Sequence, residues 1–365
     1  MLIGIDASRA VTDQPTGTET YSQQLIRALI DLAPDRRFRL YFNQLPKADL
    51  FHGAHVELRT IPLTRLWTHI RLSIEVKLHP PDVLFIPSHV LPILHPRRSV
   101  VTVHDLGYLH FPNAHPRAQR LYLDASTRWN ARASTRLIAD SQATKDDLIS
   151  HYHTPTDKIV VAYPGLDPAL RREDDPQRLH SVRSKYGIDG DYLLHVGTLQ
   201  PRKNLSRLIK AFSRSKAKLQ LVIAGKKGWL YDSLFRQVER LSLTQRVIFP
   251  GYIADEDKAA LISGATALVF PSLYEGFGFP AVEAMACGTP VVCSNTSSLK
   301  EIAGEAAMLV NPTDTDDIAA AIQVVASNAD LRLTLAERGY EQAGKFTWQA
   351  CARSVLEVLD DVAAR

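Results

Sequence analysis

Short apolar runs alternate with longer amphipathic stretches along all 365 residues of the chain. Runs of Val, Ile, Leu and Phe without polar alternation are typical of parallel strands buried on both faces, and the stretches between them have the spacing of helices. In the first half the expected strands are Leu2 to Ala7, Phe38 to Phe42, Val56 to Thr60, Val83 to Ile86, Ser99 to Val103 and Arg136 to Ala139. The expected helices there are Glu19 to Leu32, Thr64 to His79, Pro116 to Ala131 and Ala143 to His151. In the second half the expected strands are Tyr192 to Val196, Gln220 to Ala224, Val247 to Phe249, Ala267 to Phe270, Val291 to Cys293 and Ala307 to Val310. This alternation predicts an α/β protein with two parallel sheets covered by helices.

A boundary between the two sheets is indicated near the middle of the chain. Tyr163 to Pro168 and Arg171 to Pro176 are rich in proline and charge and have no periodicity, which is typical of an interdomain linker. The length also suits two α/β domains better than one core. We therefore expect domains at 1–168 and 177–346, followed by an amphipathic helix within 347–365.

Composition and charge exclude several classes of protein. Apolar residues make up 45% of the chain and charged residues 22%, as in soluble globular proteins. The formal net charge of +4 arises between Met1 and Gly165 and is far too small for a nucleic-acid binder. No run has the length of a membrane span, and Met1 to Asp6 is expected to be a strand instead of a signal peptide, so the cytoplasm is the expected location. The three cysteines form no disulfide framework and no CxxC metal pair.

A glycine-rich turn followed by a helix carries the most specific chemistry. Glu275 lies on the turn and Glu283 eight residues later in the helix. Gly276 and Gly278 remove side chains where the backbone must bend and approach a ligand, and Pro280 suits a first helical turn. The turn then presents free N–H groups at the positive end of the helix dipole, while the two carboxylates can accept sugar hydroxyls.

The same turn satisfies the letters of a dinucleotide fingerprint. Gly276 to Ala281 matches G-x-G-x-x-A, but that fingerprint needs an acid at the end of the next strand. The next strand, Pro290 to Cys293, carries none. The match is therefore weak.

A second candidate site follows the first strand of the second half. Gly197 and Thr198 stand at the strand end, and Arg202 and Lys203 come just before a helix. Arg binds two phosphate oxygens at once and Lys acts as a point charge, so together they suit a diphosphate. Cations are unfavourable at the N-terminus of a helix, where the dipole is positive, so an ordinary surface role is a less attractive interpretation of Arg202 and Lys203.

Glu275 and Glu283, in the frame Pro-Ser-x-Tyr-Glu-Gly-Phe-Gly-x-Pro, resemble the Glu-x7-Glu signature of the retaining nucleotide-sugar glycosyltransferases of family four. The resemblance implies the GT-B fold: a Rossmann-like acceptor domain, a Rossmann-like nucleotide-sugar domain, the donor in the cleft between them, and a final helix that crosses back to the first domain. It also implies that Glu283 holds the ribose, that Glu275 holds the transferred hexose, and that Arg202 and Lys203 bind the pyrophosphate. The implied neighbours of the donor are Gly276, Phe277 and Gly278.

Other stretches match the family in part. Pro15 to Tyr21 resembles its glycine-rich loop through Gly17, with Glu19 and Thr20 where a second glycine and an arginine are common. The resemblance also places Gly225 near the nucleotide, and Tyr252 and Ile253 where the backbone pairs with the base.

A histidine of the first half matches the family too. His104, in the element Val-His-Asp, is implied to lie beside the transferred sugar, and Asp105 to shape the loop. Ala139 to Gln142 resembles an Ala-x-Ser stretch and is expected to form a structural turn. No metal and no cofactor are expected: Asp255 to Asp257 and Asp314 to Asp316 spell DxD, but both open helical stretches, where Asp is a routine capping residue.

The implied reaction is transfer of a hexose from a nucleotide sugar to a glycan or lipid-linked acceptor in polysaccharide biosynthesis. Val103 to Tyr108 and Ser294 to Glu301 look most like the mannosyltransferase branch, which favours GDP-mannose. A nucleotide-sugar epimerase, a phosphorylase or a non-catalytic sugar-nucleotide-binding protein are the alternatives. One predicted helix could touch a membrane, although core packing is the simpler interpretation; its relevant residues are Arg65, Trp67, Ile70, Arg71, Ile74 and Lys77.

Overall fold

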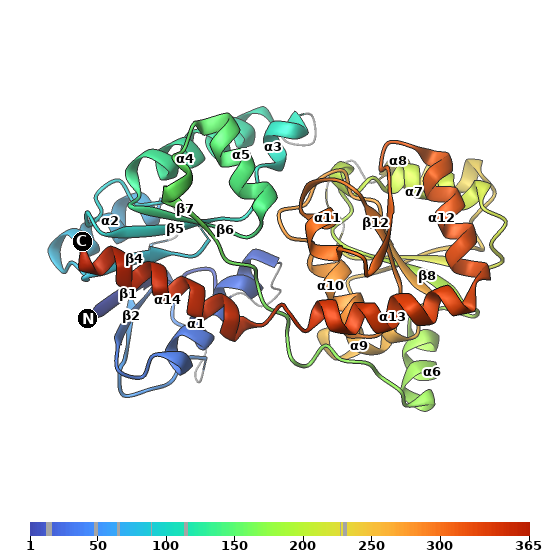
Figure 1. The fold of residues 1–365 in the computed structure, drawn as a ribbon, viewed down its shortest axis with the longest axis horizontal. Helices are drawn as coiled ribbons and strands as arrows, with labels where there is room; N and C mark the ends of the chain where they lie inside the picture. Colours follow the sequence, from blue (N-terminus) through green and yellow to red (C-terminus); the bar gives the residue numbers. More distant parts are fainter. Residues whose placement is uncertain are drawn as a thin grey trace. The chain divides into compact units, whose positions relative to one another are not determined.

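The computed structural model describes residues 1–11, 17–46, 50–63, 66–88, 90–112, 116–226, 228 and 232–365. The chain divides into two compact units (Figure 1). The first unit holds Met1–Gly165 together with Phe346–Arg365, and the second holds Leu166–Lys345. The change from the first unit to the second thus falls within the proline-rich stretch around Gly165, and the chain returns to the first unit for its last helix.

The first unit is built on a seven-stranded sheet in the order β3-β2-β1-β4-β5-β6-β7, with every pair of neighbours parallel. Its strands are β1 (Leu2–Asp6), β2 (Arg37–Phe42), β3 (Val56–Thr60), β4 (Val83–Ile86), β5 (Ser99–Val103), β6 (Arg136–Ala139) and β7 (Ile159–Val161). Its helices are α1 (Gly17–Leu32), α2 (Ser73–Leu78), α3 (Gly107–His110), α4 (Arg117–Ala133), α5 (Gln142–Tyr152) and α14 (Trp348–Ala364). A 3-10 turn, η3, covers Thr156–Lys158, and a π-helical turn, η1, covers Thr68–Leu72 directly before α2.

The last helix is an integral part of the first unit. α14 packs along α1 and against β4, β5 and β6, and in Figure 1 the two helices lie side by side as a red and a blue ribbon. Its buried face comprises Trp348, Cys351, Ala352, Val355, Val358, Leu359 and Val362. A Cβ on Gly165 would lie 2.1 Å from the Trp348 nitrogen, so only glycine allows this approach of the two segments. At the other end of α14, Arg136 pairs with Asp361 at 2.9 Å.

The second unit contains a six-stranded parallel sheet in the order β10-β9-β8-β11-β12-β13. Its strands are β8 (Tyr192–Val196), β9 (Gln220–Ala224), β10 (Val247–Gly251), β11 (Ala267–Phe270), β12 (Val291–Ser294) and β13 (Ala307–Val310). Its helices are α6 (Pro176–Lys185), α7 (Leu205–Arg214), α8 (Asp232–Arg240), α9 (Asp255–Ser263), α10 (Phe279–Ala286), α11 (Ser297–Ala303), α12 (Thr315–Ser327) and α13 (Ala329–Ala343). A short 3-10 turn, η4 (Pro201–Lys203), precedes α7.

The predicted α/β class and the predicted strands are confirmed, with two local differences. β7 was not expected; it occupies only the first three residues of the apolar run Ile159 to Tyr163, directly before the proline-rich stretch. The predicted helix from Thr64 to His79 is confirmed from Thr68 to Leu78, but its first turn is π-helical (η1) and only the rest is the α-helix α2; Thr64 and Arg65 lie outside the described residues. Trp67 is buried there, and its indole N–H donates to the Ile61 carbonyl at 2.7 Å.

The two DxD sequences serve the fold in the way expected of helix starts. Asp314 caps α12 by accepting hydrogen bonds from the backbone N–H groups of Asp316 and Asp317. Asp257 is buried in the first turn of α9 and accepts from Arg178 and Lys185 of α6. Both carboxylates therefore have structural partners.

Candidate functional site

The candidate site of the second unit forms where the order of its sheet reverses. The chain leaves β8 toward β9 on one side, while β11 lies on the other side of β8. In open α/β sheets this reversal opens a crevice at the carboxyl ends of the two central strands, and ligands bind there. Gly197 and Thr198 follow β8, and the segment carrying Glu275 follows β11.

Three charged side chains meet at this point. Lys203 Nζ lies 2.7 Å from Glu275 Oε1, and Arg202 Nη1 lies 2.8 Å from Glu275 Oε2. Arg202 Nη1 also donates to the Tyr274 carbonyl. The Glu275 side chain is only 8% exposed, and those of Lys203 and Arg202 are 9% and 14% exposed. The structure thus brings together the two motifs that the sequence had placed 72 residues apart. We name Arg202, Lys203 and Glu275 the charged trio; its net charge is positive, because it has two cations and one anion.

The trio fixes the ionisation of Glu275. Burial by itself disfavours the carboxylate, but the charges of Arg202 and Lys203 outweigh it and lower the pKa of Glu275 to about 2. The backbone of the turn is held as well: Glu275 N–H donates to Ser297 Oγ at 3.0 Å, and Ser298 Oγ donates to the Glu275 carbonyl at 2.9 Å. Glu275 is therefore a fixed acceptor that is ionised at neutral pH.

The Phe270 ring lies under Lys203 and also carries a stacked histidine ring. The Lys203 ammonium group lies 4.8 Å from the centroid of the Phe270 ring, and the His195 ring stacks on the same phenyl ring at 5.3 Å. Burial lowers the pKa of His195 to about 4, so this imidazole is neutral near pH 7. His195 was not predicted from the sequence; as a neutral group it leaves the charge of the trio unchanged.

Glu283 has a partner that the sequence did not indicate. It is buried in α10, and its Oε1 lies 2.6 Å from Nζ of Lys258 on α9. Burial lowers the pKa of Lys258, but Glu283 more than compensates, so the pKa stays above its usual value. Before α10, Gly278 has φ +104°, and a Cβ there would lie 2.5 Å from Leu299 Cδ2. The turn that starts α10 therefore requires glycine at this position.

Gly225 and Gly197 lie against each other at the ends of β9 and β8. Gly225 has φ +147°, and a Cβ on it would lie 2.0 Å from the Gly197 carbonyl oxygen. Beyond β10, Ile253 is buried, whereas Tyr252 is 41% exposed and its ring lies 5.0 Å from Lys226 Nζ. These strand ends thus offer a ligand their backbone groups and one aromatic ring, that of Tyr252.

The Gly225→Ala variant is expected to lose stability, because its methyl group cannot fit beside Gly197. The strained backbone alone costs about 1 to 3 kcal/mol. Gly190→Ala is a matched control, since a Cβ at Gly190 meets nothing within 4 Å. Urea unfolding followed by circular dichroism measures both variants. Equal midpoints would contradict the close packing of Gly225.

The first unit contains a histidine paired with an acid. His104 follows β5, and its Nδ1 lies 2.6 Å from Oδ2 of Asp140, which follows β6. The Tyr21 ring of α1 meets the imidazole edge to face, with centroids 4.7 Å apart. Burial opposes the imidazolium, but Asp140 outweighs it and raises the pKa of His104. The role of Asp140 was not predicted, whereas Asp105 shapes the loop by accepting from Gly107 N–H at 2.9 Å.

The glycine-rich loop is described only in part. Gly17 is exposed at the start of α1, and Glu19 pairs with Arg9 at 3.4 Å. Pro15 and Thr16 lie outside the described residues.

The Asp140→Asn variant is expected to titrate His104 at a lower pH. Without the carboxylate, the charge and the hydrogen bond of Asp140 no longer oppose burial, so the pKa of the imidazole moves downward. A pKa raised on folding stabilises the protein below the unfolded value, about 6.5, and this contribution disappears as the pH rises through the folded value. The stability lost in the variant is therefore expected to be largest below about pH 6.5. NMR titration of the ring and urea unfolding measure this; Asp146→Asn, at an exposed acid on the nearby helix α5, is the control. An unchanged midpoint would contradict the pairing.

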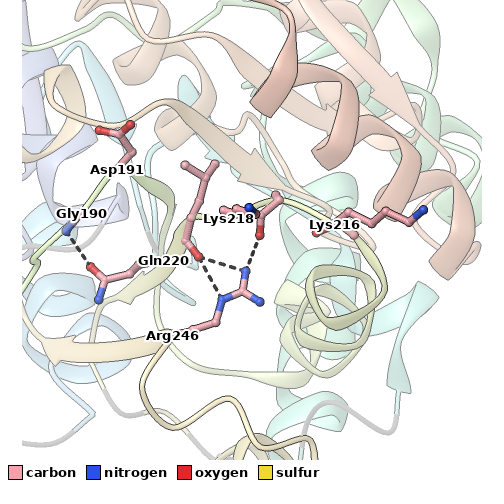
Figure 2. Close-up of a pocket in the computed structure, with 9 residues that line it drawn as sticks. Gly190, Asp191, Lys216, Lys218, Gln220 and Arg246 are labelled. Carbon is pink, nitrogen blue, oxygen red and sulfur yellow. Dashed lines mark hydrogen bonds between the residues drawn. The ribbon is translucent and has the colours of Figure 1, made fainter.

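A pocket of about 470 Å³ lies at the opposite ends of the strands, where β8 and β9 begin (Figure 2). Its guanidinium group, from Arg246, donates to the carbonyls of Ala217 and Leu219, and the Gly190 N–H donates to Gln220 Oε1 (Figure 2). These contacts hold loops together. The pocket therefore does not coincide with the candidate site.

Similarity to known proteins agrees with this geometry. Residues 181–342 match the family model of glycosyl transferases group 1, and residues 15–170 match that of glycosyltransferase family 4. The chain is 32% identical to O-antigen chain mannosyltransferase B of Escherichia coli over 71% of this chain and 69% of that protein. It is 29% identical to the serotype-specific mannosyltransferase WbdA of Escherichia coli, over 72% of this chain but only 33% of that protein.

Solved structures show the same fold. Sucrose-phosphate synthase from Thermosynechococcus elongatus matches with a TM-score of 0.78 at 22% identity, over 100% of this chain and 99% of that one. Anabaena HepE, solved in complex with UDP and glucose, matches with a TM-score of 0.75 at 21% identity, over 99% of both chains. The fold and the matched models define a GT-B glycosyltransferase. The chain belongs to glycosyltransferase family 4.

Proposed function

We propose that this glycosyltransferase moves a mannosyl residue from a nucleoside diphosphate sugar, with GDP-mannose favoured, to a glycan or lipid-linked acceptor in polysaccharide biosynthesis. The observation that carries the proposal is the charged trio at the reversal point of the second sheet. Mannose is favoured by relatives that are named O-antigen chain mannosyltransferase B and WbdA.

The trio suits the diphosphate of the donor. Two buried cations face one carboxylate, so the excess positive charge is compensated when an anion binds. As the bond to the sugar breaks, negative charge grows on the departing diphosphate, and its attraction to Arg202 and Lys203 grows with it. Stabilisation that increases toward the transition state lowers the barrier instead of merely tightening binding.

The carboxylates suit the hydroxyl groups of the donor. Each oxygen of Glu275 already accepts from a cation, but a carboxylate has about four acceptor sites, so sugar hydroxyls can be added. We assign Glu275 to the transferred hexose, together with the amides of Gly276, Phe277 and Gly278, and Glu283 to the ribose. Lys258 holds Glu283 in place. The backbone at Tyr252 and Ile253 is assigned to the base, and the loop at Gly17 to the phosphates.

Retention of configuration is the proposed stereochemical course. The candidate residues include no evident covalent nucleophile on the sugar, so the acceptor would attack the face that the diphosphate leaves. His104 is assigned to the hexose. When its imidazole is protonated, His104 and Asp140 together carry no net charge, and the pair does not repel the positive charge that develops at the anomeric carbon.

A thermal-shift panel tests the donor assignment. A ligand at 100 times its Kd stabilises the folded state by about 2.7 kcal/mol. GDP and GDP-mannose are expected to raise the melting temperature more than UDP, ADP or the sugars linked to these two nucleotides do. No shift with any of them would overturn the proposal, and a larger shift with UDP-sugars would overturn only the choice of base.

The reaction itself has two tests. Transfer from GDP-mannose to an acceptor should give a product whose anomeric proton coupling matches that of the donor, as seen by NMR. We also propose that transfer needs no metal, because Arg202 and Lys203 supply the positive charge. Activity should therefore persist after dialysis against EDTA, and activity that returns only with Mg²⁺ would contradict this part.

A peripheral contact between the first unit and a membrane is also proposed, since a lipid-linked acceptor would reside in the membrane. No helix of the described residues has the length and apolar character needed to cross a membrane. Ile70 and Ile74, at the η1 and α2 segment, are 44% and 42% exposed, whereas Trp67 is buried. Ile70→Ser combined with Ile74→Ser should reduce sedimentation with anionic vesicles. Unchanged sedimentation, or none for the wild type, would contradict this contact.

A further inference from the structure

Away from the candidate site, two histidines and one aspartate gather on the first unit. His110 is the last residue of α3, and Asp147 and His151 are one turn apart on α5 (Figure 1). His110 Nε2 lies 3.0 and 2.9 Å from the two carboxylate oxygens of Asp147, and His151 Nε2 lies 3.9 Å from Asp147 Oδ1. The ligand atoms all lie within 4.8 Å of one another. In the part of the chain that the structure describes, no other group of three such side chains is this close.

The donor set suits a transition metal. Two imidazole nitrogens and one carboxylate oxygen are typical ligands of Zn²⁺, and three protein ligands leave a fourth position for water. In a tetrahedral site with bonds of about 2.05 Å, ligand atoms are about 3.3 Å apart. The observed separations of 2.9 and 3.9 Å lie on either side of that distance. The third separation, between the two imidazole nitrogens, is at most 4.8 Å, so side-chain rotations would bring all three atoms to the bonding arrangement.

An ion could reach these residues from solvent. The side chains of His110 and His151 are 36% and 44% exposed, and that of Asp147 is 15% exposed. A plain ion pair between His110 and Asp147 accounts for two of the groups. The second imidazole, of His151, lies 3.9 Å from the same carboxylate, and its ring meets that of His110 nearly at right angles, with centroids 5.6 Å apart, so all three groups converge on one point.

We infer that His110, Asp147 and His151 bind a divalent transition-metal ion, with Zn²⁺ favoured by the donor set. The ion joins α3 to α5. α3 begins three residues after His104, and α5 begins two residues after Asp140. A bond between these helices therefore braces the two segments that carry the His104 and Asp140 pair. The ion takes no part in sugar transfer.

Titration calorimetry with Zn²⁺ on the full chain, without an affinity tag, tests the site. One ion is expected to bind per chain. His110→Ala and His151→Ala are each expected to bind Zn²⁺ at least about tenfold more weakly, since losing even a partner outside the coordination shell costs about 10- to 100-fold in affinity. His180→Ala, an exposed histidine on α6 of the second unit, should bind as the wild type does.

Co²⁺ gives a second readout that does not depend on stability. In the wild type it should produce the visible absorption of a low-coordinate nitrogen and oxygen site, and this should be lost in His151→Ala. The three cysteines are buried, so thiolate binding is not a competing source of the signal. Absence of one-to-one binding by the wild type, or binding that both histidine variants retain in full, would overturn the inference.

Discussion

The Arg202→Ala variant is expected to transfer sugar about 10²- to 10³-fold more slowly than the wild type, which is the usual cost of removing one preorganised donor to a developing negative charge. The loss should appear in kcat, because the attraction between Arg202 and the diphosphate is strongest as the bond to the sugar breaks. Lys203 still pairs with Glu275 at 2.7 Å, so the variant should fold.

The matched control is Arg214→Ala. Arg214 lies on α7 and pairs with Asp316 at the surface, where the two side chains are 55% and 78% exposed. An exposed pair of this kind contributes little to stability, and its removal should leave turnover unchanged. If Arg202→Ala folds, as judged by near-ultraviolet circular dichroism, and turns over within a few-fold of the wild type, then Arg202 does not stabilise the leaving group.

Local sequence pattern predicted the strands and marked the segments that carry the charged trio. The strand-end segments were recognisable because parallel strands buried on both faces leave uninterrupted apolar runs. The family resemblance implied that Arg202 and Glu275 act on the same donor, and both segments follow strands, whose carboxyl ends lie at one edge of a parallel sheet. The structure shows that these strands, β8 and β11, are neighbours.

Partners supplied by helix packing could not be predicted in this way. Lys258 lies on α9 and reaches Glu283 on α10 only because the two helices pack together. No motif letter identifies it. Asp140 was assigned to a turn, and Ser141 does cap α5 there. The contact between Asp140 and His104 depends on β6 lying beside β5. The order of strands in a sheet is a property of the whole fold, and no local motif states it.

The charged trio also links the site to the stability of the second unit. Folding lowers the pKa of Glu275 from 4.5 to about 2. A carboxyl with a lowered pKa stabilises the folded state above its unfolded value, and the contribution is lost as the pH falls through the folded value. The difference corresponds to about 3 kcal/mol at neutral pH, since one pKa unit is about 1.4 kcal/mol. The ion-paired carboxylate of Glu275 therefore belongs to the candidate site and also stabilises the fold of the second unit.

The Glu275→Gln variant is expected to be less stable than the wild type by about 3 kcal/mol or more at pH 7, because it also leaves two buried cations without their anion. The deficit should shrink as the pH falls from about 4.5 to about 2, where the wild-type carboxylate becomes protonated too. Urea unfolding across this pH range measures it, with the exposed Glu337→Gln as control. A constant deficit at every pH would show that the amide disturbs packing and that ionisation of Glu275 contributes nothing. Because a donor diphosphate would replace the missing anion, GDP should restore more stability to Glu275→Gln than it adds to the wild type.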